Sequence, residues 1–441
     1  MKSRSPLPTL TIRPPSKSFR LSLICAAGAA ASQLIFPTTA QAVEPSLTAI
    51  TPYLEKVLAE HPRSHQARSD VERARAEAEV LAQPLYNPEL GFSGEHKRTP
   101  AGTDSGTGET TWTRVVEVSL TTDFGAKQQR RSEIGTQGVD VANAGEAEAR
   151  LALVSEALTR LARYQGALDK EALAARQEAA MASFMRLAER QRKAGDSSAA
   201  DLSLARLALA ETARLRADAR VDLARAREEV RGLCACVPDE IAQLPPQLPI
   251  EDAVVGEDID RVLDRHPILR GLRARVEVAR SELRLSEEER IPDPTFRLGG
   301  GSEGDATLVT FGVSVPIPVL NSGSAKVRAS GRGLVTAEAA EATARREIAT
   351  ELAAARASYV EAHRGWRMWR DQAMAPIEQQ AALMERMWLG GEITATDYFI
   401  QIRETARVAQ QGSELKTSAW TSLATVLKAS NGFETFMGLA P

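Results

Sequence analysis

The chain has 441 residues, of which 26% are charged, and a formal net charge of −3. This near-neutral balance provides no basic field that would attract nucleic acid, so we expect no nucleic-acid partner. Aromatic residues make up only 5% of a sequence rich in Ala, Arg, Glu and Leu. Such a composition is typical of long helices that pack through narrow seams.

The N-terminus has the pattern of an export signal. Several basic residues precede an apolar stretch over about 21–36, and Ala40-Gln41-Ala42 provides the small residues that signal peptidase requires. We therefore expect residues 1–42 to be a signal peptide and the mature chain to begin at Val43. The alternatives are a membrane anchor and lipidation at Cys25, but the residues before this cysteine match a lipobox poorly.

The first predicted elements of the mature chain are helices that lead into a β-hairpin. The pattern is helical over about 47–83, with a break at His61-Pro62, where proline suits the first turn of a new helix. Apolar and polar residues then alternate, which predicts strands over 88–97 and 110–122. Strands of about ten residues can cross an outer membrane at a tilt.

Two long helices are predicted after the hairpin. Residues 126–193 contain no proline, and their apolar residues step by three and four positions, as in a coiled coil. The members of this seam include Leu151, Val154, Leu158 and Leu161. A turn at 194–198 separates this helix from a second one, which ends near Leu233. No run of about eighteen apolar residues occurs after residue 42, so we expect no membrane-spanning helix there.

The second half of the chain repeats the first. We assign residues 43–233 to a first repeat, 234–257 to a loop-rich connector, 258–430 to a second repeat and 431–441 to a C-terminal tail. The second repeat has a β-hairpin at about 294–318 to match the one at about 88–122. Its further elements are predicted strands at 294–303 and 306–318 and a turn between long helices at 389–394.

Matching motifs occupy matching places in the two repeats. His61-Pro62 recurs as His266-Pro267, while Gly195 and Asp201 recur as Gly391 and Asp397 at a constant separation of 196 residues. Self-similarity of this kind indicates a duplicated supersecondary unit. The predicted fold is thus mainly α with a small β part, built from a tandem helix–β-hairpin–long-helix–helix unit.

Four strands are too few to form a closed sheet. An open edge in lipid would leave backbone groups without hydrogen bonds at a cost of several kcal/mol each, and spanning barrels need about eight strands or more. The chain must therefore share a barrel with other copies of itself, and three copies would supply twelve strands. The long helices would continue beyond this barrel as a tube.

Six short motifs in order, present in both repeats, carry a resemblance to the TolC family of outer-membrane efflux proteins. They include the two His-Pro pairs, Asn87-Pro88-Glu89-Leu90 before the first strand, and Ser314-Val315-Pro316-Ile317 at the fourth. The resemblance implies a homotrimer with a twelve-stranded outer-membrane β-barrel, continued by a periplasmic α-helical coiled-coil barrel. The connector would lie in an equatorial belt around this helical barrel.

The same resemblance implies location and partners. The protein would sit in the outer membrane of a Gram-negative bacterium, in contact with outer-membrane lipid. It would work with a periplasmic membrane-fusion adaptor and an inner-membrane RND-type pump. Asn87-Pro88-Glu89-Leu90 and the unacylated N-terminus are most similar to the CzcC-type branch, which implies efflux of divalent cations of cobalt, zinc or cadmium. The alternatives are a channel for drug efflux or type I secretion, and a periplasmic coiled-coil adaptor that forms no channel.

The resemblance also implies two kinds of functional residue at the helix turns. Asp397 matches the aspartate of a TolC-like pore gate, and Trp388 matches an aromatic latch, whereas the latch cation is lost at Ile393. A plain alternative is that Asp397 caps its helix, as we expect Asp201 to do. The turns farthest from the strands are expected to dock the adaptor through Gly195, Asp196, Gly390, Gly391 and Glu392.

No residue pattern indicates catalysis or a bound cofactor. We find no nucleophile with a base at motif spacing and no phosphate-binding glycine loop, so we expect no enzyme activity and no cofactor. His61 and His65 could share a metal on one helix face, but His61 is better explained as a helix-start residue. Cys234 and Cys236 leave a metal or redox role open, although no histidine flanks them.

Overall fold

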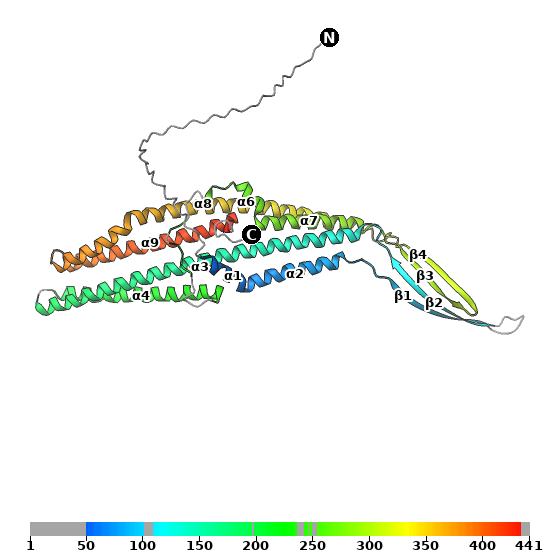
Figure 1. The fold of residues 1–441 in the computed structure, drawn as a ribbon, viewed down its shortest axis with the longest axis horizontal. Helices are drawn as coiled ribbons and strands as arrows, with labels where there is room; N and C mark the ends of the chain where they lie inside the picture. The colour runs from blue at the N-terminus through cyan, green and yellow to red at the C-terminus, as the bar shows by residue number, and fades with distance from the viewer. Residues whose placement is uncertain are drawn as a thin grey trace, which may run out of the picture. The chain divides into compact units, whose positions relative to one another are not determined.

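The computed structural model describes residues 50–100, 109–195, 198–235, 242–245, 247–248 and 254–433 (Figure 1). The predicted signal peptide and Asp196 lie outside these residues. The first repeat comprises α1 (Thr51–Glu60), α2 (Pro62–Ala82), β1 (Glu89–Thr99), β2 (Glu109–Thr121), α3 (Lys127–Ala194) and α4 (Ala199–Cys234). The second comprises α6 (Ile259–Arg265), α7 (Pro267–Glu288), β3 (Thr295–Glu303), β4 (Ala306–Ser314), α8 (Ser324–Leu389) and α9 (Ala395–Ser430). The predicted fold class is confirmed.

The four strands form one antiparallel sheet in the order β1-β2-β3-β4. β4 ends at Ser314, earlier than the predicted residue 318. Pro316 and Pro318 follow, and proline has no N–H to donate to a neighbouring strand. In Figure 1 the sheet extends beyond the ends of α2, α3 and α7, on the side away from α4 and α9.

The register of the strands separates apolar from polar side chains. Phe92 lies opposite Val116, Val118 opposite Leu298, and Phe296 opposite Val313. Because side chains alternate along a strand, these residues share one face of the sheet. The exposed apolar residues of this face are Leu90, Phe92, Trp112, Val116, Val118, Leu120, Phe296, Leu298, Val309, Phe311 and Val313. The opposite face carries mainly glycine, serine, threonine and charged residues.

The main core lies where the long helices meet α1. The predicted seam of α3 is buried, with Leu158 and Leu161 at 0% exposure. Tyr359 of α8 and Trp420 of α9 belong to the same core. The close approach of α9 to α8 requires a glycine, because a Cβ on Gly412 would lie 2.1 Å from the nearest ring atom of Trp369.

A buried ion pair joins the two repeats where the helices meet the sheet. Lys127, in the first turn of α3, places its Nζ 2.5 Å from Asp293 Oδ1, and both side chains are almost fully buried. The same Nζ donates to the carbonyl oxygen of Ile291 at 2.6 Å. Tyr86 Oη donates to Asp293 Oδ2 at 2.7 Å, and the backbone N–H of Phe124 donates to Asp293 Oδ1 at 3.2 Å. Both carboxylate oxygens are therefore satisfied.

These contacts alter the titration of the acid and the phenol. Burial acts to raise the pKa of Asp293, but the hydrogen bonds from Lys127, Tyr86 and Phe124 outweigh it and hold the pKa below its ordinary value. The hydrogen bond to Asp293, together with burial, raises the pKa of Tyr86 to about 12. The charged carboxylate is thus the stable form of Asp293 at neutral pH.

We predict that Asp293→Asn lowers the free energy of unfolding by about 3–5 kcal/mol, because the buried Lys127 ammonium loses its counter-charge. Urea unfolding of the detergent-solubilised protein would measure the loss. A matched control is Lys326→Met, which removes an ion pair with Glu289 in which the lysine side chain is 60% exposed. We expect that change to cost less than about 1 kcal/mol.

The same variant has a pH signature. Because the native pKa of Asp293 is depressed, its contribution to stability is complete above the ordinary value of 3.8 and is lost as the pH falls through the lower native pKa. Asp293→Asn should lack this part of the acid-dependent loss. Equal acid sensitivity in both proteins would contradict the assignment.

Candidate functional site: the two helix tips

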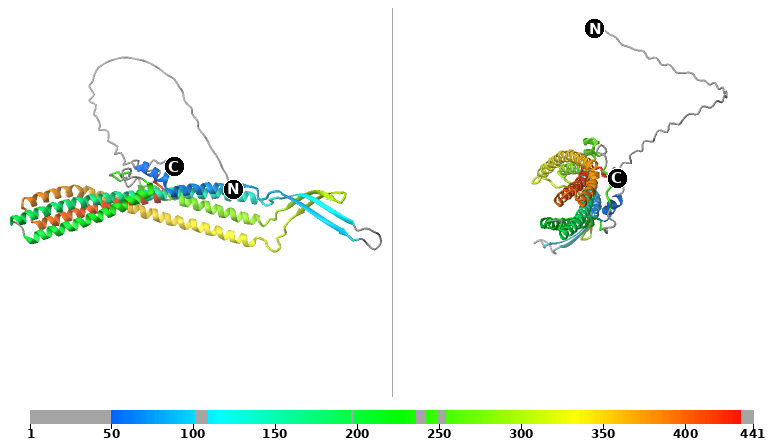
Figure 2. Two further views of the ribbon diagram at one scale, coloured as in Figure 1. Left: turned by 90° about the horizontal axis from the view of Figure 1, so that it is seen from below. Right: turned by 90° about the vertical axis from the view of Figure 1, so that its left-hand side faces the viewer.

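The two long hairpins end side by side, far from the sheet. Figure 2 shows the ends of α3–α4 and α8–α9 together at the side of the helices opposite β1–β4. Each end is a short turn: α3 stops at Ala194 and α4 begins at Ala199, while α8 stops at Leu389 and α9 begins at Ala395. We call these the first tip and the second tip.

Both tips use the same local chemistry to start the returning helix. In the first tip the backbone N–H of Asp201 donates to Ser198 Oγ at 3.1 Å, and Ser198 N–H donates back to Asp201 Oδ2 at 2.9 Å. In the second tip Thr394 and Asp397 make the equivalent bonds at 3.1 and 3.4 Å. These reciprocal bonds are capping boxes, which satisfy N–H groups that a helix start leaves without partners. Asp397 therefore caps its helix, as Asp201 does.

Each tip also contains a glycine in the left-handed region. Gly195 has φ +89° and Gly391 has φ +75°, a conformation that costs glycine little because it has no Cβ. Gly390 N–H donates to Arg386 O at 2.9 Å, and Glu392 N–H donates to Met387 O at 2.8 Å, so the last carbonyls of α8 are satisfied. The Glu392 side chain is exposed.

Aromatic residues join the two hairpins close to the tips. The ring of Trp388 in α8 stacks on Tyr398 in α9 at 4.5 Å and lies 5.1 Å from Phe184 in α3. All three side chains are buried, and Met181 belongs to the same cluster. Burial raises the pKa of Tyr398. We call these four residues the aromatic clasp, because they come from both hairpins.

The two predicted gate residues, Trp388 and Asp397, have different surroundings. Trp388 is only 6% exposed and faces the interior of its own chain, and Ile393 packs at the edge of the same cluster. Asp397 is exposed beside its cap partner. Asp397 and Trp388 thus lie near one another along the chain, but only Asp397 has a side chain open to solvent.

The residues considered as metal ligands have structural roles. His61 Nδ1 accepts the backbone N–H of Arg63 at 3.1 Å, which makes His61 the cap of α2. Cys234 is fully buried and disulfide-bonded, and Cys236 lies outside the described residues. Within the ranges that the structure describes, no three His, Cys, Asp or Glu side chains gather as metal ligands would.

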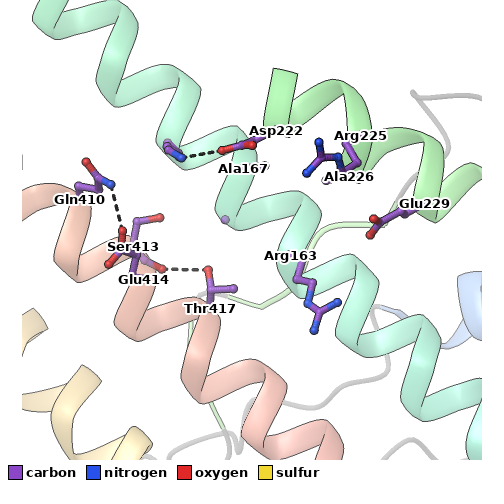
Figure 3. Close-up of a pocket in the computed structure, with 12 residues that line it drawn as sticks. Arg163, Ala167, Asp222, Arg225, Ala226, Glu229, Gln410, Ser413, Glu414 and Thr417 are labelled. Atoms are coloured by element: carbon purple, nitrogen blue, oxygen red, sulfur yellow. Dashed lines mark hydrogen bonds and ion pairs between the residues drawn. The ribbon is translucent and has the colours of Figure 1, made fainter. Parts of the chain in front are cut away.

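A cavity of about 400 Å³ lies between α3, α4 and α9 (Figure 3). Lys170 donates to Asp222 at 2.6 Å across it, and Gln410 donates to Glu414 at 3.0 Å along α9. Arg163 also lines this cavity. Because basic and acidic side chains alternate around the space, it favours no charge class of ligand.

The comparisons with known proteins agree with this architecture. The chain is similar to the outer-membrane channel OprN, with 17% identity, coverage of 87% of this chain and 90% of that chain, and a TM-score of 0.71. It is also similar to the CmeC outer membrane channel of Campylobacter jejuni, with 14% identity, coverage of 87% and 86%, and a TM-score of 0.70. For CusC the identity is 14%, the coverage 87% and 92%, and the TM-score 0.69. These likenesses establish the fold.

Residues 53–235 match the protein family described as outer membrane efflux protein. This match covers most of the first repeat, whereas the likenesses to the solved channels extend over both repeats. Both findings agree with the location in the outer membrane that the sequence predicts. TolC-family channels are trimers that work with adaptors and inner-membrane pumps. A search of curated proteins finds no match for this chain.

Across the described part of the chain, no helix combines the length and apolar character that a membrane crossing requires. Sequence reasoning missed the Lys127–Asp293–Tyr86 network and the aromatic clasp. Asp293 precedes a proline at the start of a strand, as Asn87 does in the first repeat, and this change from a neutral to a charged residue was the signal available. Phe184 and Tyr398 gave no signal in the sequence beyond apolar positions on long helices.

Proposed function

We propose that three copies of this chain form the outer-membrane channel of a tripartite efflux system, which conducts substrate passively from a pump and an adaptor. The observation that carries the proposal is the register of the sheet. It gathers exposed Phe92, Val118, Leu298 and Phe311 on one face, where a soluble protein would place polar residues. Such a face suits contact with lipid, while the opposite face suits a water-filled lumen.

The polar face gives some support to a cationic substrate. Its strand positions include four glutamates and two basic residues: Glu89, Glu95, Glu117, Glu303, Lys97 and Arg297. Three copies would surround the lumen with a net negative charge, which raises the local concentration of cations. Together with the resemblance at Asn87-Pro88-Glu89-Leu90, this favours divalent heavy-metal cations as cargo. Drug efflux and type I secretion are the competing functions.

We predict that deletion of the gene sensitises cells to zinc, cobalt or cadmium. The measurement is the minimal inhibitory concentration of each metal, with the wild-type gene restored on a plasmid as a control. Sensitivity confined to dyes, detergents or antibiotics would favour the drug-efflux function. No change with any compound, despite a trimer in the outer membrane, would argue for secretion.

We also propose that the adaptor docks on the two tips, because they lie farthest from the sheet along the helices. Glu392 offers a direct test, since its side chain is exposed and substitution there leaves the left-handed glycines intact. Glu392→Lys should reduce efflux at least severalfold while the trimer remains in the outer membrane. The matched control is Glu55→Lys on α1, an exposed site remote from both tips, which should leave efflux unchanged. Equal efflux in the two variants would place the docking surface elsewhere.

We propose further that Asp397 faces the pore at its periplasmic end, in addition to capping α9. Three carboxylates converging on one axis would repel each other unless a cation lies among them, so the ring should favour cations. The two repeats provide a matched pair of variants. Asp397→Ala and Asp201→Ala remove the same capping box, each at a cost of about 1 kcal/mol. In planar bilayers only Asp397→Ala should weaken cation preference and divalent block. An equal effect of both variants would leave Asp397 with the capping role alone.

A further inference from the structure

The two repeats have equivalent helices in unequal surroundings. α3 contacts α2 of its own repeat and α7 of the other, whereas α8 contacts α7, the counterpart of α2, and among the described elements no helix takes the place beside α8 that α7 takes beside α3. Over residues 127–150 of α3 only five residues are exposed: Gln129, Thr136, Asp140, Gly145 and Glu148. Over the equivalent residues 324–347 most of α8 is exposed. One flank of α8 therefore lacks the neighbour that its counterpart has.

The sheet shows the same asymmetry. Within the described strands β2 pairs on both sides, with β1 and with β3, while β4 pairs with β3 alone. The hairpins themselves correspond, because Glu89 lies opposite Ser119 in the first and Thr295 lies opposite Ser314 in the second. In this correspondence β4 is equivalent to β2, and β1 is equivalent to β3. The strand that pairs with the second edge of β4, as β3 pairs with β2, would therefore be β1 of another copy. Unsatisfied backbone groups along the edges of β4 and β1 give that pairing its driving force.

We propose that β4 pairs with β1 of a second copy in the register that β2 makes with β3, above a junction that lacks the buried ion pair. The pair Glu117–Gly299 then corresponds to Gly312 with Ser93 of the next copy, and Val118–Leu298 corresponds to Val313 with Phe92 of the next copy. Val313 and Phe92 both belong to the apolar face, so this register continues that face without a break. A slip by one residue would turn one strand over.

The junction beneath this seam follows from the same correspondence. Asp293 precedes β3 through Pro294, and its counterpart before β1 is Asn87. α3 and α8 each follow a residue in the left-handed region, Ala126 with φ 56° and Gly323 with φ 70°, so Ser324 takes the place of Lys127. Both charges of the pair are thus replaced together by neutral residues. Lys326 does not substitute for Lys127, because it already pairs with Glu289 of its own chain.

The neutral replacement has a physical reason. Within one chain the ion pair is buried as soon as the two repeats fold together, so neither charge is left without its partner. At a seam between copies the two groups meet only on assembly, and a carboxylate without its cation would have to be desolvated. Asn87 and Ser324 avoid that cost. The inference rests on the proposed trimer and adds the register and the chemistry of its seam.

The register can be tested by disulfide trapping in the intact protein. Ser93→Cys combined with Gly312→Cys should give linked dimers and trimers on non-reducing denaturing gels after mild oxidation in outer-membrane preparations. Ser93→Cys with Val313→Cys, which would place the thiols on opposite faces, should give monomer, as should either single variant. Stronger linkage in Ser93→Cys with Thr310→Cys or with Ser314→Cys would overturn the register.

The state of the oligomer separates this inference from the proposed function. Native mass measurement of the same variants shows whether copies associate at all. A trimer that no pair traps would contradict the seam and leave the channel intact, whereas a monomer in detergent would contradict both.

The neutral junction has its own test. Asn87→Asp should lower the temperature at which the trimer dissociates in detergent, because it introduces a buried carboxylate without a cation. Ser324→Lys in the same chain should restore that temperature. An unchanged temperature in Asn87→Asp, or no restoration in the double variant, would contradict the correspondence of Asn87 with Asp293.

Discussion

The arrangement of helices and sheet depends on the satisfied carboxylate of Asp293. This side chain precedes β3 in the second repeat, yet its partners Lys127, Tyr86 and Phe124 all belong to the first. A long helix packed through small residues can slide along its neighbour at little cost, because successive layers of alanine are alike. A buried charge with three defined donors cannot slide, so it fixes how the helices and the sheet of the two repeats line up.

The tips show how the same backbone can serve different roles. Ser198 with Asp201 and Thr394 with Asp397 form nearly identical capping boxes, and each tip has one left-handed glycine. The start of the returning helix is therefore held alike in the two tips. The ends of the preceding helices differ, because α3 ends at the left-handed Gly195, whereas α8 ends at the right-handed Gly390, before the left-handed Gly391. The side chains differ as well, above all at Trp388, whose ring connects the second hairpin to Phe184 of the first. Any movement of one hairpin against the other must break that contact between large buried rings, which makes the clasp a barrier to independent motion.

Periodic features were predictable from the sequence, and pairwise features were not. The alternation around Phe92 and Val118 and the three-and-four spacing around Leu158 predict strands and helical seams, because each depends on neighbours along the chain. The Tyr86–Asp293 hydrogen bond joins residues 207 positions apart, so no local pattern contains it. The early end of β4 could have been read from Pro316 and Pro318. The burial of Trp388 could not, since a tryptophan near a turn is compatible with an exposed or an enclosed ring.

The strict pairing of strands also limits which changes in length the chain can tolerate. Insertion of one residue between Val116 and Leu120 would exchange the two faces of the rest of β2, and Val118 would move to the side of Glu117. Insertions in pairs, or at hairpin ends, would preserve the alternation. Homologous sequences should accordingly keep β2 constant in length while they diverge freely in composition, and gaps in their alignment should fall at the ends of strands.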